Sequence, residues 1–86
     1  MPYIIIKNIS IQFGVPVLSG ILERGSLAVG SDVQIVRDEE TIAQGSVCGI
    51  LLNGKAVDRA GLGQTIQLTV RGANIGLVAV GDRICF

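Results

Sequence analysis

The side chains that could do chemistry in this 86-residue chain are two cysteines and seven carboxylates. Histidine, the commonest general base and metal ligand, is missing. Cys48 and Cys85 are far apart in sequence, and neither has a neighbouring ligand or base. The sequence therefore favours two free, buried thiols over a zinc site or a disulfide. A thiol-dependent enzyme stays open as an alternative.

The carboxylates and glycines do not form a recognisable catalytic or nucleotide-binding motif. Glu23, Asp58 and Asp82 are each followed by an arginine, which favours turn caps and exposed ion pairs over a catalytic pair. The string Gly61-Leu62-Gly63 lacks the following helix and the Gly-Lys-Ser/Thr ending of a phosphate-binding loop, so these are turn glycines before a strand. We expect no enzymatic activity, no cofactor or metal, and no binding of GTP or GDP.

Composition indicates one globular domain over residues 1–86. Hydrophobic residues make up 49% of the chain, and seven basic residues balance seven acidic ones without forming a basic stripe. The run Asp38-Glu39-Glu40 is typical of a solvated hairpin tip. The apolar start ends at Lys7, too early for a signal peptide, and no segment is long enough to span a bilayer. We expect a cytoplasmic protein without a membrane partner.

The secondary structure that positions these residues is predicted to be all β. Twelve glycines are scattered among β-branched segments, and no stretch keeps a helical apolar spacing. Gly25 and Gly30 indicate turns with positive φ, and Asn53-Gly54 predicts a tight hairpin that folds Ile50–Leu52 back towards Ala56-Val57. The expected strands are Tyr3–Phe13, with a break at Lys7-Asn8, Val15–Glu23, Asp32–Arg37, Thr41–Leu52, Gln64–Arg71 and Asp82–Phe86.

A motif in the first half of the chain resembles a known family. Residues 19–35 read SGILERGSLAVGSDVQI. This is similar to the β-barrel second domain of translational GTPases such as elongation factor Tu, where a Thr-Gly strand end, a Val-Glu-Arg-Gly turn and Leu-x-Val-Gly-Asp-x-Val follow one another. Further along, Leu68–Gly72 resembles the family's Leu-Leu-Arg-Gly ending, and Gly81–Ile84 its Arg-Gly-Asp-Val-Leu closing strand. The resemblance covers nearly the whole chain.

The resemblance implies a closed six-stranded Greek-key barrel that binds partners and does no chemistry. In the family these partners include the aminoacylated 3′ end of tRNA, ribosomal RNA and neighbouring domains. Only the barrel matches here, so we expect no GTPase domain. The family's Gly-Arg-Gly loop falls on Phe13-Gly14-Val15, which lacks the basic side chain, and tRNA binding is therefore expected to be weak with a shallow salt slope. Arg24 and Arg71 match family arginines that are expected to support turns.

The departures from the family pattern are apolar. Several positions that are usually polar on the barrel exterior or in the last connection carry large aliphatic residues, and Val15 and Val17 are expected on the outer face of the second strand. An inner set is expected to fill the core alone: Leu18, Leu22, Val33, Ile35, Val47, Ile66, Leu68, Val70 and Ile84. The candidate interaction surface is Val17, Ile21, Leu51, Ile75, Leu77 and Val80, which we expect to form one continuous patch.

Two readings of function remain. The charge balance favours a binding module that acts by protein–protein contact or self-association, with a homodimer as the smallest expected assembly. The alternative is an accessory of RNA or the ribosome, which would retain the partner of the family.

Overall fold

The computed structural model describes residues 2–23 and 25–86. Arg24, whose match to a family arginine predicts a turn-supporting role, lies outside the described residues. The elements, in chain order, are β1 (Tyr3–Gln12), β2 (Val15–Leu22), β3 (Leu27–Ala28), β4 (Asp32–Arg37), β5 (Glu40–Leu52), β6 (Lys55–Val57), β7 (Arg59–Ala60), β8 (Thr65–Arg71), the 3₁₀ turn η1 (Ile75–Leu77) and β9 (Arg83–Cys85). Within the described residues, no helix is long and apolar enough to cross a membrane.

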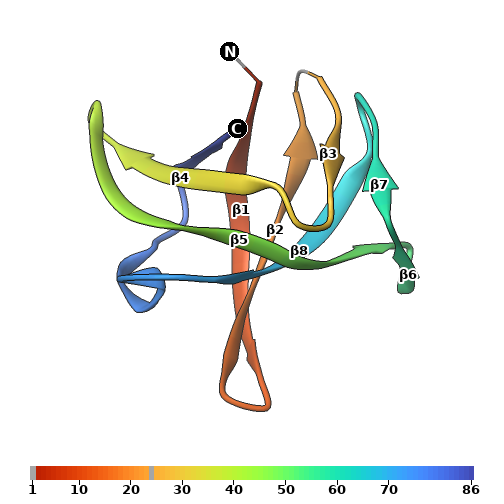
Figure 1. The fold of residues 1–86 in the computed structure, drawn as a ribbon, viewed down its shortest axis with the longest axis horizontal. Coiled ribbons are helices and arrows are strands. Elements are labelled where there is room, and N and C mark those ends of the chain that lie inside the picture. The colour runs from red at the N-terminus through yellow and green to blue at the C-terminus, as the bar shows by residue number, and fades with distance from the viewer. Residues whose placement is uncertain (1, 24) are drawn as a thin grey trace.

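Six of the strands form a closed antiparallel barrel (Figure 1). Hydrogen bonding runs in the order β4-β9-β1-β2-β8-β5, and the pairing of β5 with β4 closes the ring. Strand β6 pairs only with β5, and β3 forms a two-stranded ribbon with β7. All six predicted strands are present, which confirms the all-β barrel of the translation-factor second-domain type. The short strands β3, β6 and β7 and the turn η1 were not predicted individually.

The predicted break in β1 is a β-bulge. The register with β2 shifts between Ile6 and Asn8, which leaves Lys7 as the extra residue. A bulge bends its strand, so one strand can serve two neighbours. The first half of β1 pairs with β9 at Tyr3, Ile4 and Ile5, whereas the second half pairs only with β2. The bulge thus marks where β1 leaves the barrel wall.

Three hairpins turn through two consecutive residues with positive φ, the geometry whose twist matches that of the flanking strands. Asn53 (φ 53°) and Gly54 (φ 79°) join β5 to β6, as predicted. The acidic pair Asp38-Glu39 joins β4 to β5 at an exposed tip, also as predicted. The turn between β1 and β2 uses Phe13 (φ 52°) and Gly14 (φ 76°).

The core lies inside the barrel, and all nine residues predicted to fill it are buried. Alternation within β8 is clear, because Ile66, Leu68 and Val70 point inward and the residues between them remain accessible. The nine do not fill the core alone, since seven further members come from β1, β3, β5, β7 and η1: Ile4, Ile6, Leu27, Ala43, Ile50, Ala60 and Ile75. The core is therefore complete without the most exposed apolar side chains of the chain.

Candidate functional site

Large apolar side chains on the outside are the main unexplained feature of this barrel. They are not needed for the core, and their contact with water is unfavourable. They lie on the β1–β2 hairpin, the outer face of β2, the turns before β4 and β8, and the connection between β8 and β9. The exposed members are Ile11, Phe13, Val15, Ile21, Val29, Leu62, Leu77 and Val80.

The greatest exposure is found at the end of the β1–β2 hairpin, which projects from the barrel (Figure 1). We call residues 11–15 the hairpin tip. Strand β9 pairs with β1 only as far as Ile5, and β8 pairs with β2 only from Val17, so the tip is a two-stranded ribbon without a third strand. Phe13 stands fully exposed at its turn, and Ile11 is 65% exposed. The tip presents apolar side chains on a segment held only by its own ladder.

An open groove of about 610 Å³ lies beside the hairpin tip. One wall comes from the hairpin, and the other comes from the end of β8 and the residues that follow it. Several glycines keep the groove open, because they place no side chain in it. Its side-chain lining is mainly apolar: Ile11, Val15, Pro16, Val70 and Ile75, with Arg71 and Asn74 as the polar members.

The candidate surface predicted from sequence is placed correctly only in part. Ile21, Leu77 and Val80 are exposed, and Leu51 is half-buried. Val17 (6% exposed) and Ile75 (7%) are buried, so the expectation that their side chains are exposed is wrong. Val17 alternates with the inward-facing Leu18 and so lies on the outer face, but it is buried there without belonging to the core cluster. Ile75 joins the core from η1.

The exposed members do not form one continuous patch, contrary to expectation. Ile21 lies on β2, paired with Ile5 and Thr65. The carbonyl of Leu77 accepts a hydrogen bond from Arg37 at the end of β4. In the closed ring, β2 and β4 are three strands apart in either direction, so these side chains lie on opposite sides of the barrel. Phe13, Ile11, Val29 and Leu62 were not predicted for the surface, although a turn position beside Gly14 was the available signal for Phe13.

The connection between β8 and β9, residues 72–82, is fixed by a buried carboxylate. Asp82 is 3% exposed and accepts two hydrogen bonds from the Arg37 guanidinium, 2.8 Å from Nε and 2.9 Å from Nη2. The backbone N–H of Ala79 donates a third, at 2.8 Å. Because the same Arg37 Nη2 also donates to the Leu77 carbonyl at 3.0 Å, one guanidinium holds the connection at two points.

This network corrects a sequence-based interpretation and perturbs two pKa values. Asp82 was expected to form an exposed pair with the adjacent arginine, yet its buried carboxylate pairs with Arg37, whose side chain is 43% exposed. The hydrogen bond from Arg37 is the main reason that the pKa of Asp82 is lowered, and the Ala79 N–H adds to it. The same bond raises the pKa of Arg37. The pair is ionised near neutral pH. It holds the connection in place and is not poised to transfer a proton.

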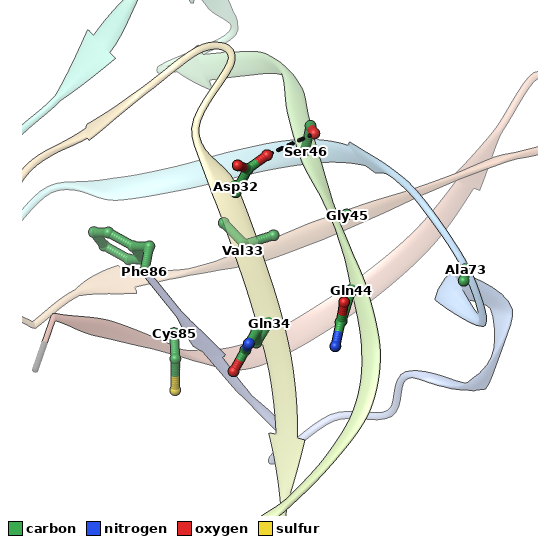
Figure 2. A pocket seen from close by; sticks show the side chains of 9 residues that line it. All are labelled: Asp32, Val33, Gln34, Gln44, Gly45, Ser46, Ala73, Cys85 and Phe86. Atoms are coloured by element: carbon green, nitrogen blue, oxygen red, sulfur yellow. Dashed lines mark hydrogen bonds between the residues drawn. The ribbon is translucent and has the colours of Figure 1, made fainter.

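A second hollow, of about 630 Å³, lies over β4, β5 and β9. Figure 2 shows Gln34 and Gln44 from neighbouring strands, with Cys85 and Phe86 at one side and a hydrogen bond from Ser46 to Asp32 (3.1 Å) at the other. Cys85 supplies a thiol to this lining, but the lining holds no histidine or lysine, and its only carboxylate, Asp32, already accepts the Ser46 hydroxyl. The hollow offers polar contacts without a catalytic arrangement.

The two cysteines are free, as expected, but Cys48 is exposed and Cys85 is half-buried, so the expectation that both are buried is wrong. Cys48 is the extra residue of a bulge in β5, which turns it away from the core. Among residues 2–23 and 25–86, no group of three or more His, Cys, Asp or Glu side chains could hold a metal ion.

Comparison with known proteins supports the fold. No family model matches the sequence, and no curated protein matches it. Among solved structures, the chain is similar to the translation elongation factor SelB from Methanococcus maripaludis in its apo form, with a TM-score of 0.81 and 15% identity. The match covers 98% of this chain and 18% of that one, so this chain spans less than a fifth of SelB. The likeness confirms a barrel of the translation-factor second-domain type.

Proposed function

We propose that this protein is a non-catalytic binding module that acts through protein contacts made by apolar side chains outside its barrel. The observation that carries this proposal is that eight large apolar side chains are exposed on a domain whose core is complete without them. Isolated exposed apolar residues are ordinary. Here three of the eight lie together on one projecting hairpin next to an apolar groove, which is the composition of a protein-binding surface.

Charge argues for protein rather than RNA as the partner. Binding to nucleic acid depends on cationic side chains that neutralise phosphates, and the net charge of this chain is zero. The hairpin and both its strands carry no charged side chain from Asn8 to Leu22. Because the fold is that of a translation-factor domain, an RNA or ribosome-associated role is the competing proposal. The experiment below distinguishes it from protein binding.

The test is capture of partners by the purified full-length protein from its native lysate, with and without nuclease. We expect to capture a protein in the presence of nuclease as well as in its absence. At least one of Phe13→Asp, Ile21→Lys and Leu77→Glu should reduce the amount captured. The matched control is Thr65→Lys, which adds the same charge as Ile21→Lys at the paired position on β8. Captured material that nuclease removes, or that none of the three apolar variants affects, would contradict the proposal.

A further inference from the structure

Phe13 is the exposed residue that the fold itself explains least. It occupies the first central position of a two-residue turn with φ of 52°, where asparagine, aspartate or glycine is ordinarily preferred. Its side chain is fully exposed and covers no part of the core. An aromatic residue in a disfavoured conformation and in contact with water stabilises nothing within its own chain. A role outside the chain is therefore the natural explanation.

The groove beside the tip has the shape and chemistry to receive a phenyl ring. Ile11 and Pro16 on one side and Val70 on the other provide apolar contact, and Gly72 and Gly76 leave room between them. Arg71 also lines the groove, and no ion pair or hydrogen bond joins its guanidinium to another of the described residues. A guanidinium without a carboxylate partner can stack on an aromatic face, which gives the groove a preference for an aromatic occupant.

The ring and the groove lie next to each other on one chain, which is the arrangement that a two-fold axis requires. An axis passing beside the tip brings each ring to the groove of the other copy, and both contacts form at once. Phe13 is fully exposed and is not among the residues that line the groove of its own chain. We propose that two copies of this chain form a two-fold dimer in which Phe13 of each copy occupies the groove of the other, against Arg71.

This inference rests on the proposed function and names a second copy as the partner. The uncharged hairpin supports that choice, since two tips can meet without repulsion. Arg71 is the single charged residue among those that line the groove, which disfavours phosphate-rich RNA and anionic lipid as occupants.

The size of the contact sets the expected strength. One phenylalanine buries about 150–250 Å² of its surface, and the exposed parts of Ile11 and Val15 add to it. Two such contacts total roughly 1,000 Å², below the 1,200–2,000 Å² or so of stable complexes. We therefore expect a reversible dimer with a dissociation constant between about 1 and 100 µM.

The first arm of the test is sedimentation of the full-length chain across a concentration series. We expect a monomer–dimer equilibrium that Phe13→Asp weakens at least about tenfold, because a carboxylate at the turn is tolerated but cannot enter an apolar groove. Phe13→Trp should preserve the dimer and supply the only tryptophan of the chain, whose emission should shift to the blue as the dimer forms. Thr41→Asp is the control, because Thr41 is exposed on the β4–β5 hairpin and belongs to neither the apolar exterior nor the groove, and it should leave the equilibrium unchanged.

The second arm blocks the groove instead of the ring. Gly76 lines the groove, and a Cβ built there meets no atom within 4 Å, so Gly76→Leu should fill the groove without disturbing the barrel. We expect this variant to be monomeric. A mixture of Phe13→Asp and Gly76→Leu should form more dimer than either alone, because the mixed pair retains one intact contact between a ring and a groove.

Any of three results would overturn the inference. The wild-type chain could stay monomeric at about 100 µM, Phe13→Asp could leave the dimer as strong as before, or the mixture of variants could form no more dimer than either variant alone. A monomer that nevertheless captures a protein through its apolar exterior overturns the inference and leaves the proposed function standing. A dimer weakened by both variants and restored in the mixture supports both.

Discussion

The hairpin tip and the β8–β9 connection both expose large apolar side chains, but their backbones are held in opposite ways. In the connection, the Asp82 carboxylate accepts three hydrogen bonds, and the Gly81 N–H donates to the Ile6 carbonyl at 2.9 Å. The tip has only its own two-stranded ladder. The backbone of Leu77 is therefore held by the rest of the barrel, whereas the backbone of Phe13 is held only by the hairpin itself.

The exposure of an apolar side chain does not by itself identify an interface. At Leu77 the backbone carbonyl accepts a hydrogen bond from Arg37, so the fold sets the position of this residue whether or not its side chain binds a partner. An apolar side chain on an unsupported ribbon lacks that explanation. Variants in the two regions should therefore separate into those that change stability and those that change association.

The largest expected effect is at Gly72, where the connection begins. A Cβ there would overlap the backbone carbonyl of Gln44 on β5, so Gly72→Ala should lower the free energy of unfolding by about 3 kcal/mol in chemical denaturation. The counterpart in the hairpin is Gly14→Ala, whose Cβ meets no atom within 4 Å but whose φ is 76°. That change should cost only about 1 kcal/mol of backbone strain. Equal effects at the two sites would show that the connection is no more tightly held than the hairpin tip.

Next in size is Arg37→Ala. The change leaves the buried Asp82 carboxylate with the Ala79 N–H as its remaining donor, so we expect about 1–3 kcal/mol of destabilisation in thermal or chemical unfolding. Arg83→Ala is the matched control, because Arg83 is adjacent to Asp82 in sequence but exposed and outside the network. It should change stability by less than about 0.5 kcal/mol. A larger effect at Arg83 than at Arg37 would show that the pairing is wrong.

A pH titration should distinguish the two regions without a mutation. The folded pKa of Asp82 is lowered below the unfolded value of about 3.9, so its contribution to stability is complete above that value and is lost as pH falls through the folded pKa. The hairpin has no titratable side chain between Asn8 and Leu22. In acid, NMR shifts of the Ala79 and Gly81 amides should therefore change before those of the tip. If the amide shifts of both regions changed at the same pH, Asp82 would not be holding the connection locally.

The smallest expected effect is at Phe13. Phe13→Asn should stabilise the monomer by about 0.5–1 kcal/mol, because asparagine tolerates positive φ better than phenylalanine does. The measurement is chemical denaturation at low protein concentration, where the dimer does not contribute. Leu77→Ser, at an ordinary exposed position, should change stability by less than about 0.5 kcal/mol. A loss of monomer stability in Phe13→Asn would mean that the ring supports the fold after all.

Sequence by itself determined the barrel, the strand positions and the core. Alternation in β8 and the paired turn residues Asn53-Gly54 are local signals, since strand periodicity and turn conformation depend on residues close together in the chain. The nine predicted core residues were correct for the same reason, because which face of a strand a residue occupies follows from its position along that strand.

Only the tertiary structure decided which outward residues stay exposed and which charges are paired. Val17 points outward as expected and is nevertheless buried, whereas Ile21 on the same face of β2 is exposed. Asp82 pairs with Arg37, 45 positions away, rather than with its neighbour Arg83. Closure of the barrel also placed β2 and β4 on opposite sides, which separated Ile21 from Leu77. Each outcome depends on contacts between segments distant in sequence, which local pattern does not encode.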